Sequence, residues 1–389
     1  MKWHETILII LVLSISTAIV AQEEQEKQPV LETRGYIKDM QGFSVVNNMD
    51  SISTINLVHN RINFKINVSQ KISARLEVRN RIFWGDQVKQ IPGFGKIINR
   101  YNGLVNLSHT WVSKQSFVMH SVIDRLLVQY QTEKWDIKLG RQRINWGINT
   151  TWNPNDIFNA YDFLDFDYEE RPGNDGIRIQ HFTRSNQSWE FACKPGKKKN
   201  ETIAALLYKF NKRKTDWQVL AGLFQQDWVA GTGWAGNIRK AGFKGEVSYF
   251  HPRKNSFDTS GIISLSLMAD QTFEKNWYIS LAALFNSNPP GMQTFGSSIY
   301  GNELTAKQLF PFRYSFYAGF MKSFSPVLSL NGSVVYATEK NTLILFPSLT
   351  WNASTNFDIN LITQSFFSMN NGYYKSLGNS FFLRIKLSL

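Results

Sequence analysis

The feature that most constrains this chain is a long series of segments in which apolar and polar residues alternate. The stretch "RINFKINVSQKISARLEVRNRIFW", residues 61–84, is a clear example. Apolar side chains occupy alternate positions from Ile62 to Val68 and again from Ile72 to Val78. A period of two gives each strand one apolar face and one strongly polar face. Strands of a soluble sandwich and strands of a membrane barrel both satisfy this pattern.

Strand length and repetition distinguish the two folds. Sandwich strands usually run about five or six residues, whereas membrane-spanning strands need about nine to eleven. Long alternating segments recur along the whole chain. We predict strands at 33–44, 55–69, 71–84, 120–131, 134–143, 175–183, 187–194, 202–212, 215–226, 238–250, 259–270, 276–287, 311–323, 326–339, 342–352, 355–368 and 376–389. Aromatic residues, 14% of the chain, lie near many strand ends, which favours girdles at two membrane interfaces over ordinary core packing.

The N-terminus indicates export. A lysine, an apolar run at 7–20 and small residues before a polar run form a cleaved secretory signal peptide over residues 1–21. A membrane-anchoring helix is the weaker alternative, since the apolar run is short for a span. We predict a short periplasmic leader at 22–32 and an outer-membrane barrel at 33–389. No run of 18 apolar residues follows the signal peptide, so no transmembrane helix is expected.

The connections between predicted strands are of two kinds. Tight turns at 131–134 and 211–216 contrast with long loops at 85–119, 144–174 and 288–310. Bacterial outer-membrane barrels differ in this way between their periplasmic and external ends, and they have an even number of strands. We therefore predict an all-β fold, a transmembrane antiparallel β-barrel of 16 or 18 strands, with 18 preferred. The segments above number 17, and the order of short and long connections breaks between 226 and 241. One strand there is missed or wrongly divided.

The last segment, "SFFLRIKLSL", alternates to the final residue, Leu389. Such an ending suits a strand that closes the barrel against the first one. It also resembles the C-terminal signal that the outer-membrane assembly machinery recognises, although an aromatic residue is more usual at the end.

Motifs for other kinds of function are weak. The single cysteine, Cys193, excludes a disulfide framework and a cysteine metal cluster. The six histidines show no HExxH spacing, and the sequence has no GxSxG motif and no phosphate loop ending in GK[ST]. We expect no enzyme activity, no metal, no cofactor and no nucleic-acid partner. Calcium binding by the acidic segment described below is a minor alternative.

Residues 139–158, "LGRQRINWGINTTWNPNDIF", raise the main functional question. By strict alternation Arg141 points outward, where a charge at mid-bilayer costs about 2–4 kcal/mol. It must therefore lie near the rim or beside a bulge at Gly140. The loop 145–174 is too long for a turn, and we predict that it folds back into the lumen as a constriction. An exposed external loop with solvated charges is the alternative.

Opposed charges in a narrow aqueous channel select permeants by their charge. The predicted pore-lining basic residues are Arg75, Arg79, Arg81, Lys138, Arg141, Arg143 and Arg178. The predicted acidic residues of the constriction loop are Asp156, Asp162, Asp165, Asp167, Glu169 and Glu170.

Three motifs carry a resemblance to a known group: "LGRQRINWG…NPNDIFN", "ERPGNDGIRIQ" and "GWAGNI…GFKGEVSYF". Together they resemble uncharacterised outer-membrane β-barrel proteins of the Bacteroidota, and more distantly porins of the alginate-export type. The resemblance covers nearly the whole mature chain. It implies a channel in the outer membrane of a Gram-negative cell and provides no catalytic residues.

Taken together, the sequence predicts a porin-like channel for small hydrophilic solutes. A formal charge of +13 and arginines on polar strand faces favour anionic solutes. Outer-membrane lipid and lipopolysaccharide, the assembly machinery and small solutes are the expected partners. The first alternative is the barrel of an export apparatus for an anionic polysaccharide. The second is an outer-membrane hydrolase, for which His120 beside a serine at the barrel rim is the only candidate.

Overall fold

The alternating segments of the sequence form antiparallel strands of a single sheet. The structure is a computed structural model that describes residues 29–46, 51–99, 103–160, 167, 173–184, 186–254, 260–289 and 304–389. The predicted signal peptide and most of the leader lie outside the described residues. Among the described residues, no helix is long and apolar enough to cross a membrane.

The elements follow one another around the sheet. The first strands are β1 (Leu31–Val46), β2 (Ser51–Asn67), β3 (Ile72–Trp84), β4 (Ser108–Lys114), β5 (Phe117–Gln131) and β6 (Trp135–Gln142). The next are β7 (Asn174–Arg184), β8 (Gln187–Lys194), β9 (Ile203–Lys212), β10 (Thr215–Phe224), β11 (Asp227–Ile238) and β12 (Ala241–Pro252). The last are β13 (Ile262–Phe273), β14 (Trp277–Asn286), β15 (Tyr314–Ser325), β16 (Leu328–Ala337), β17 (Thr342–Ser354), β18 (Phe357–Asn370) and β19 (Tyr373–Ser388). Short helical turns are α2 (Asp86–Gln90), α3 (Phe94–Ile98), η1 (Lys199–Glu201), η2 (Glu274–Asn276) and η4 (Glu339–Asn341).

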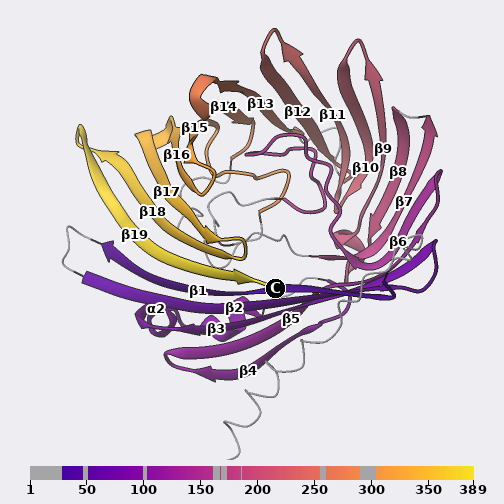
Figure 1. Cartoon of the computed structure of the whole chain (residues 1–389). Coiled ribbons are helices and arrows are strands. Elements are labelled where there is room, and N and C mark those ends of the chain that lie inside the picture. The colour runs from indigo at the N-terminus through magenta and orange to yellow at the C-terminus, as the bar shows by residue number, and fades with distance from the viewer. Residues whose placement is uncertain are drawn as a thin grey trace, which may run out of the picture. The chain divides into compact units, whose positions relative to one another are not determined.

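The sheet closes on itself because the last strand pairs with the first. β19 and β1 are antiparallel, with pairs from Tyr36↔Ser388 to Val45↔Asn379, and the closed ring is visible in Figure 1. The described residues form 19 strands in this sheet. β3 pairs directly with β5, and β4 only flanks part of β5, so 18 strands make the ring and the predicted barrel is confirmed. Closure removes the open strand edges that lipid cannot satisfy.

The uncertain region of the predicted strand list, 226–241, contains a complete strand. β11 fills it, and β12 begins at Ala241 rather than at 238. β11 escapes the alternation test because its sequence, "DWVAGTGWAGNI", is rich in glycine and alanine and lacks a clear polar face. Its connection to β10 is also only two residues long, at 225–226, on the side where we expect long loops. The extra strand makes the number even.

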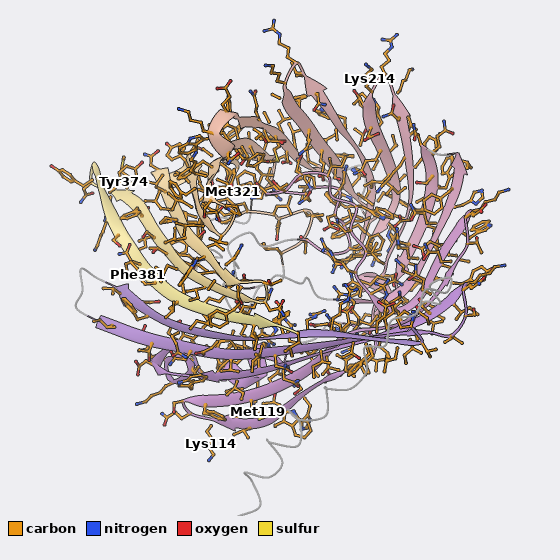
Figure 2. All side chains as sticks on the ribbon, viewed as in Figure 1. Lys114, Met119, Lys214, Met321, Tyr374 and Phe381 are labelled. Atoms are coloured by element: carbon orange, nitrogen blue, oxygen red, sulfur yellow. The ribbon has the colours of Figure 1, made fainter. Side chains whose placement is uncertain are left out.

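The two faces of the wall differ as a membrane barrel requires. Outward side chains are apolar and exposed, for example Leu139 at 63% and Trp228 at 58%. Inward positions include fully buried charged or polar groups such as Glu246 and Ser248. Figure 2 shows side chains on both faces of the wall, with Phe381 on β19 and Met119 on β5 labelled.

The barrel has two distinct rims. Tight turns join the strands at the short-turn rim, where β1 begins and β19 ends: 68–71, 132–134, 213–214, 239–240, 274–276, 326–327 and 355–356. The opposite, long-loop rim carries the connections 85–116, 143–173 and 287–313, in agreement with the predicted long loops. In outer-membrane barrels the short turns face the periplasm.

The wall is interrupted where β6 ends. β6 pairs with β5 only as far as Arg141↔Leu126, and beyond that point β5 pairs with β4 instead. The segment 103–107 leads into β4 at this junction, where the Leu107 carbonyl accepts a hydrogen bond from the Ile123 amide. One strand therefore replaces another beside β5.

Arg141 joins the parts of this junction. It shares a face with Leu126, which is 46% exposed, yet Arg141 itself is only 2% exposed. Its Nε donates to Asp175 Oδ1 at 2.7 Å, and its Nη atoms donate to the carbonyls of Ile123 and Val105. Because β6 ends here, its backbone amides do not donate to these two carbonyls.

The register answers the question raised by Arg141. It places the side chain on the outward face at the end of β6, one residue before the strand stops, and not among the pore-lining residues. The predicted bulge is absent, since pairing continues through Leu127↔Gly140 and Gly140↔Gly176. Gly140 does adopt a φ of 119°, and a Cβ there would lie 2.3 Å from the Leu126 carbonyl oxygen. The ion pair with Asp175 and the covering segment 103–107 make an outward arginine tolerable.

Removing the partner of Arg141 should destabilise the barrel. In Asp175→Ala, Arg141 keeps its charge on the outward face without its carboxylate, and breaking such a pair typically costs about 3–5 kcal/mol. We expect a loss of this order in the free energy of unfolding, measured by urea titration of barrels refolded in lipid vesicles. Glu133→Ala, which removes an exposed turn carboxylate, is the matched control and should change little. Equal effects of the two variants would contradict the assigned role.

Candidate functional site

The segment that follows β6 turns into the barrel and packs against the inner wall. Ile144 and Trp152 are completely buried, and Trp146 is 1% exposed. Ile144, Trp146, Ile157 and Phe158 belong to one apolar cluster with inward residues of β8 to β12. The coil of residues 144–160 lies within the ring of strands in Figure 1. These residues form the described part of the predicted constriction loop.

One carboxyl group of the wall binds three backbone amides of the loop. Glu246 on β12 is fully buried. Its Oε1 accepts hydrogen bonds from the amides of Ile148 and Asn149, at 2.5 and 2.8 Å, and its Oε2 accepts one from Asn155, at 2.9 Å. Polar backbone groups that are buried need such partners. Glu246 therefore supplies hydrogen-bond acceptors to the backbone of this irregular segment, as a neighbouring strand does for each strand of the wall.

The glycines of β11 leave room for the same segment. A Cβ on Gly233 would lie 2.8 Å from Ile148 Cδ1 and 2.9 Å from Asn155 Nδ2. A Cβ on Gly231 would lie 2.7 Å from Asn155 Oδ1. Asn155 also donates to the Thr232 carbonyl at 3.0 Å and accepts from Ser248 at 2.8 Å. The glycines that make β11 difficult to recognise in the sequence are thus the residues that let the loop approach it.

A second loop packs beside the first. Leu309, Phe310 and Phe312, from the connection between β14 and β15, are each no more than 2% exposed. They share an apolar cluster with Trp152, and the ring centroids of Trp152 and Phe310 are 5.9 Å apart. The inner wall from β8 to β16 is therefore covered by apolar packing.

The opposite inner wall carries positive charge. It is formed by β1, β2, β3, β5 and β19, whose register aligns Lys38 with His59 and Lys386, and Arg61 with Arg79. We call this surface the cationic wall. Its basic residues are Lys38, Arg61, Arg75, Arg79, Arg81, Arg125, Arg384 and Lys386.

Two strand carboxylates organise part of the cationic wall. Asp124 Oδ2 lies 2.8 Å from Arg61 Nη1 and 3.0 Å from Arg79 Nε. Arg61 also pairs with Glu77. On the described residues of these strands, basic side chains outnumber carboxylates.

Asp167 reaches the cationic wall from the loop. Its Oδ1 lies 2.7 Å from Lys38 Nζ and 3.7 Å from Arg384 Nη1, and its Oδ2 lies 3.9 Å from His59 Nδ1. Lys38 is fully buried. Burial alone would raise the pKa of Asp167, but the contact with His59 and the charge of Lys38 outweigh it and hold that pKa at about 2.

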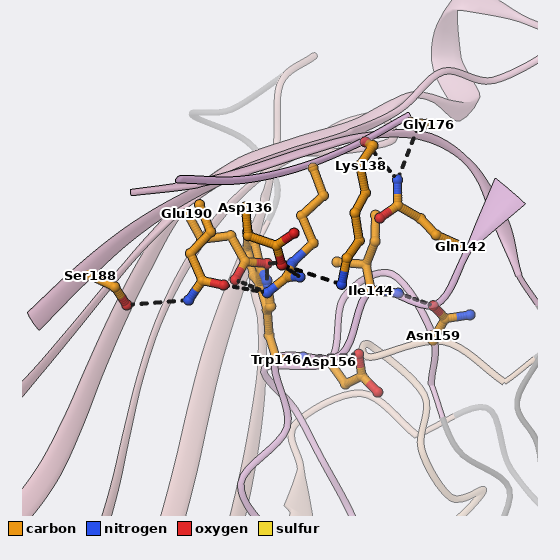
Figure 3. A network of polar contacts seen from close by, with 12 residues as sticks. Asp136, Lys138, Gln142, Ile144, Trp146, Asp156, Asn159, Gly176, Ser188 and Glu190 are labelled. Atoms are coloured by element: carbon orange, nitrogen blue, oxygen red, sulfur yellow. Dashed lines mark hydrogen bonds and ion pairs between the residues drawn. The ribbon is translucent and has the colours of Figure 1, made fainter. Parts of the chain in front are cut away.

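The other predicted site residues occupy several positions. Arg75, Arg79 and Arg81 lie on the cationic wall. Lys138 and Arg178 lie on the inner faces of β6 and β7, where both approach Asp136 at 3.3 Å. Figure 3 shows this group, with Trp146 of the loop directed at Glu190. Arg143 is exposed at the start of the loop.

The predicted acidic residues do not face one common wall in the described part of the loop. Asp156 is buried and accepts a bond from the Trp146 amide of its own loop, at 3.4 Å. Asp167 meets Lys38 of β1, His59 of β2 and Arg384 of β19, which the prediction did not include. The remaining four, Asp162, Asp165, Glu169 and Glu170, lie outside the described residues.

Sequence analysis did not single out Lys38, Arg61, Arg384 or Glu246. Three of these are cations on the polar faces of alternating strands, so the pattern was visible. The alternation of polar and apolar residues does not indicate which strands lie opposite the loop, because their position depends on how the barrel closes. Glu246 gave no signal beyond its alternate position in β12.

The fold and this lumen define a class, the membrane-spanning β-barrel with an inward-folded loop. No protein-family model matches this chain, and no curated protein sequence matches it. Among solved structures, Acinetobacter baumannii OccAB4 is similar, with a TM-score of 0.59 and 10% identity over 93% of this chain and 99% of that chain. Pseudomonas aeruginosa OccK5 (OpdH) has a TM-score of 0.58 and 8% identity, over 92% and 98% of the two chains. The outer membrane protein OprD of the same organism has values of 0.56 and 10%, over 94% and 95%. At such identities the similarity shows the fold alone, which this chain shares with these three structures.

Replacing Glu246 should release the loop from the wall. Glu246→Gln keeps the size but puts an NH2 group where backbone amides donate, and each hydrogen bond contributes about 0.5–1.5 kcal/mol. We expect the amides of Ile148, Asn149 and Asn155 to exchange hydrogen at least about tenfold faster, since protection follows the free energy of local opening.

Two further variants serve as the positive and the negative control for this measurement. Gly233→Val should accelerate the same amides, because its side chain would occupy the space of Asn155 and Ile148. Glu133→Gln, on an exposed turn, should leave them unchanged. Unchanged exchange in Glu246→Gln would show that the carboxyl group does not hold the loop.

The contact of Asp167 with the wall should persist in mild acid. A carboxylate with a depressed pKa contributes stability that is present above its unfolded value, here 3.8, and is lost as pH falls through the folded value of about 2. We therefore expect the difference in ion selectivity between the wild type and Asp167→Asn to stay constant from pH 8 to pH 4. It should disappear as pH approaches 2. Reversal potentials across planar bilayers measure it, and a difference that vanishes near pH 5 would contradict the assignment.

Proposed function

We propose that this protein is an outer-membrane channel for small hydrophilic solutes that prefers anions, with the loop 145–174 as its constriction. The observation that carries the proposal is the cationic wall opposite an inward loop. A cation-rich surface in a low-dielectric channel raises the local concentration of anions and lowers that of cations. Proteins of the same fold support the porin-like part of the proposal and the outer-membrane location.

The arrangement of the loop supports a constriction. Its described part is held at several strands through Glu246, Asn155 and Asn149, the last of which donates to Ser266 at 2.9 Å. Asp167 lies farther along the chain and contacts strands of the other wall. A segment held at both sides narrows the aqueous path between them, so permeating solutes pass close to the partly exposed Arg384 and Lys386, above the buried charge of Lys38.

No specific feature favours the two alternatives. An exporter of an anionic polysaccharide would also use a cationic lumen, so the two functions differ in whether the isolated barrel conducts. A hydrolase built on His120 is disfavoured because both ring nitrogens are engaged, Nδ1 with Arg81 and Nε2 with Asn99, each at 3.2 Å. Among the described residues there is also no cluster of ligands suited to a metal ion. Kinship with Bacteroidota barrels and alginate-export porins, and contacts with lipopolysaccharide and the assembly machinery, remain predictions.

Single-channel recording under a KCl gradient tests the proposal. We expect steady conductance and a reversal potential that favours Cl⁻, because the cationic wall repels K⁺. Lys38→Gln combined with Arg384→Gln should remove much of this preference. Lys71→Gln, on a turn outside the lumen, is the matched control.

The possible outcomes of this recording distinguish the candidate functions. A cation-selective wild type would contradict the assigned sign of selectivity. A correctly folded barrel without conductance would move the assignment to a gated exporter.

A further inference from the structure

Positive charge also gathers on one part of the short-turn rim. The turns that join β9 to β10, β11 to β12 and β13 to β14 are neighbours in the wall. With the adjoining strand ends they carry Lys212, Arg213, Lys214, Arg239, Lys240 and Lys275, and Lys322 lies beside them near the end of β15. All of these except Lys322 are exposed, and Figure 2 shows Lys214 at the tip of its hairpin. We call this surface the basic turn cluster.

The cluster is local and weakly compensated. Asp216 and Glu274 are the acidic residues beside it, and Asp216 already accepts a bond from Asn211 at 2.7 Å. Farther along the rim, the turns at 326–327 and 355–356 carry no charge. The turns 68–71 and 132–134 carry one lysine each, Lys71 and Lys134, the latter next to Glu133. Positive charge is therefore densest on the rim over β9 to β15.

The backbone shows that these cations are not placed for the sake of the turn. Arg213 and Lys214 have φ values of 54° and 61°, between the paired residues Lys212 and Thr215. Two-residue turns with positive φ at both positions favour Asn-Gly. Arg239 has a φ of 57° at the first position of the next turn, where glycine is favoured. Basic residues therefore occupy these turn positions although the backbone conformation is unfavourable for them.

Outward aromatic side chains lie next to the cluster. Trp217 pairs with Trp234 across β10 and β11, and their ring centroids are 6.2 Å apart. Trp277 pairs with Phe273, both are exposed, and Lys322 Nζ lies 5.3 Å from the Trp277 ring centroid. Aromatic side chains of this kind mark the membrane interface. The basic turns therefore lie at the level of lipid headgroups.

We propose that the basic turn cluster binds the phosphate groups of anionic phospholipids at the periplasmic surface of the membrane. Lysine and arginine near an anionic lipid surface are each attracted to it, and arginine matches phosphate geometry especially well. Hairpin turns in this wall repeat every two strands, roughly 10 Å apart, which leaves room for a headgroup at each turn. The inference rests on the barrel fold and is independent of what the channel conducts.

The decisive variant removes charge and improves the turns. Arg213→Asn, Lys214→Gly, Arg239→Gly and Lys240→Asn together introduce residues that the turn conformations favour, so the barrel should fold at least as well. The matched control, Lys197→Asn with Lys198→Asn and Lys199→Asn, removes lysines beside η1 at the long-loop rim. Single-channel conductance should be unchanged in both proteins and verifies folding.

The measurement counts bound lipid. Barrels reconstituted in nanodiscs of phosphatidylcholine and phosphatidylglycerol at equal amounts are released and analysed by native mass spectrometry. We expect the wild type and the control variant to retain phosphatidylglycerol preferentially, and the turn variant to lose about tenfold or more of that preference. Equal retention by all three proteins overturns the proposal. No lipid preference in the wild type, together with polyglutamate binding that the turn variant loses, overturns it in favour of an acidic polypeptide partner.

Discussion

The need to pair every backbone group within a lipid-facing wall governs this structure. β1 and β19 meet that need at the seam through ten consecutive residue pairs from Tyr36 to Val45. The hydrogen-bond ladder between β5 and β6 stops at the end of β6. Beyond that point β4, the segment 103–107 and the Arg141–Asp175 pair provide the partners of the wall. An arginine on the outward face is costly in lipid, so its presence there reflects the greater cost of leaving carbonyls of β5 and its neighbour without donors. The junction also allows the chain after β6 to leave the wall and enter the lumen.

Within the lipid-spanning part of the closed wall, charged side chains are accommodated on the inward face. The structure divides that interior into two dissimilar halves. Over β8 to β16 the inward loops bring their own apolar side chains, so this half resembles a protein core. Over β1 to β5 and β19 the strands carry cations partly balanced by Asp124 and Glu77. A loop attached to one half and reaching the other with Asp167 gives the interior a transverse arrangement of charge.

Glu246 illustrates how the two halves depend on each other. Irregular backbone at membrane depth is tolerated only where it is buried in protein or lines a water-filled cavity. Here one carboxyl group satisfies three amides of the loop, and the missing side chains of Gly231 and Gly233 let the backbone approach. The loop position therefore results from residues of β11 and β12 as much as from residues of the loop itself.

The sequence by itself determined the class of fold, because a two-residue period recurs over segments long enough to span a membrane. Counting along the strand indicated an outward Arg141, but the sequence also admitted it among the pore-lining residues, and the register of β5 and β6 decided between the two positions. The sequence did not reveal β11, since glycine and alanine carry no alternation, and glycine is there to make space for a loop more than 70 residues away in the chain. Only the tertiary structure decided that Asp167 meets Lys38 and Arg384. These residues come together because β19 closes against β1, and closure is a property of the whole ring that no local pattern encodes.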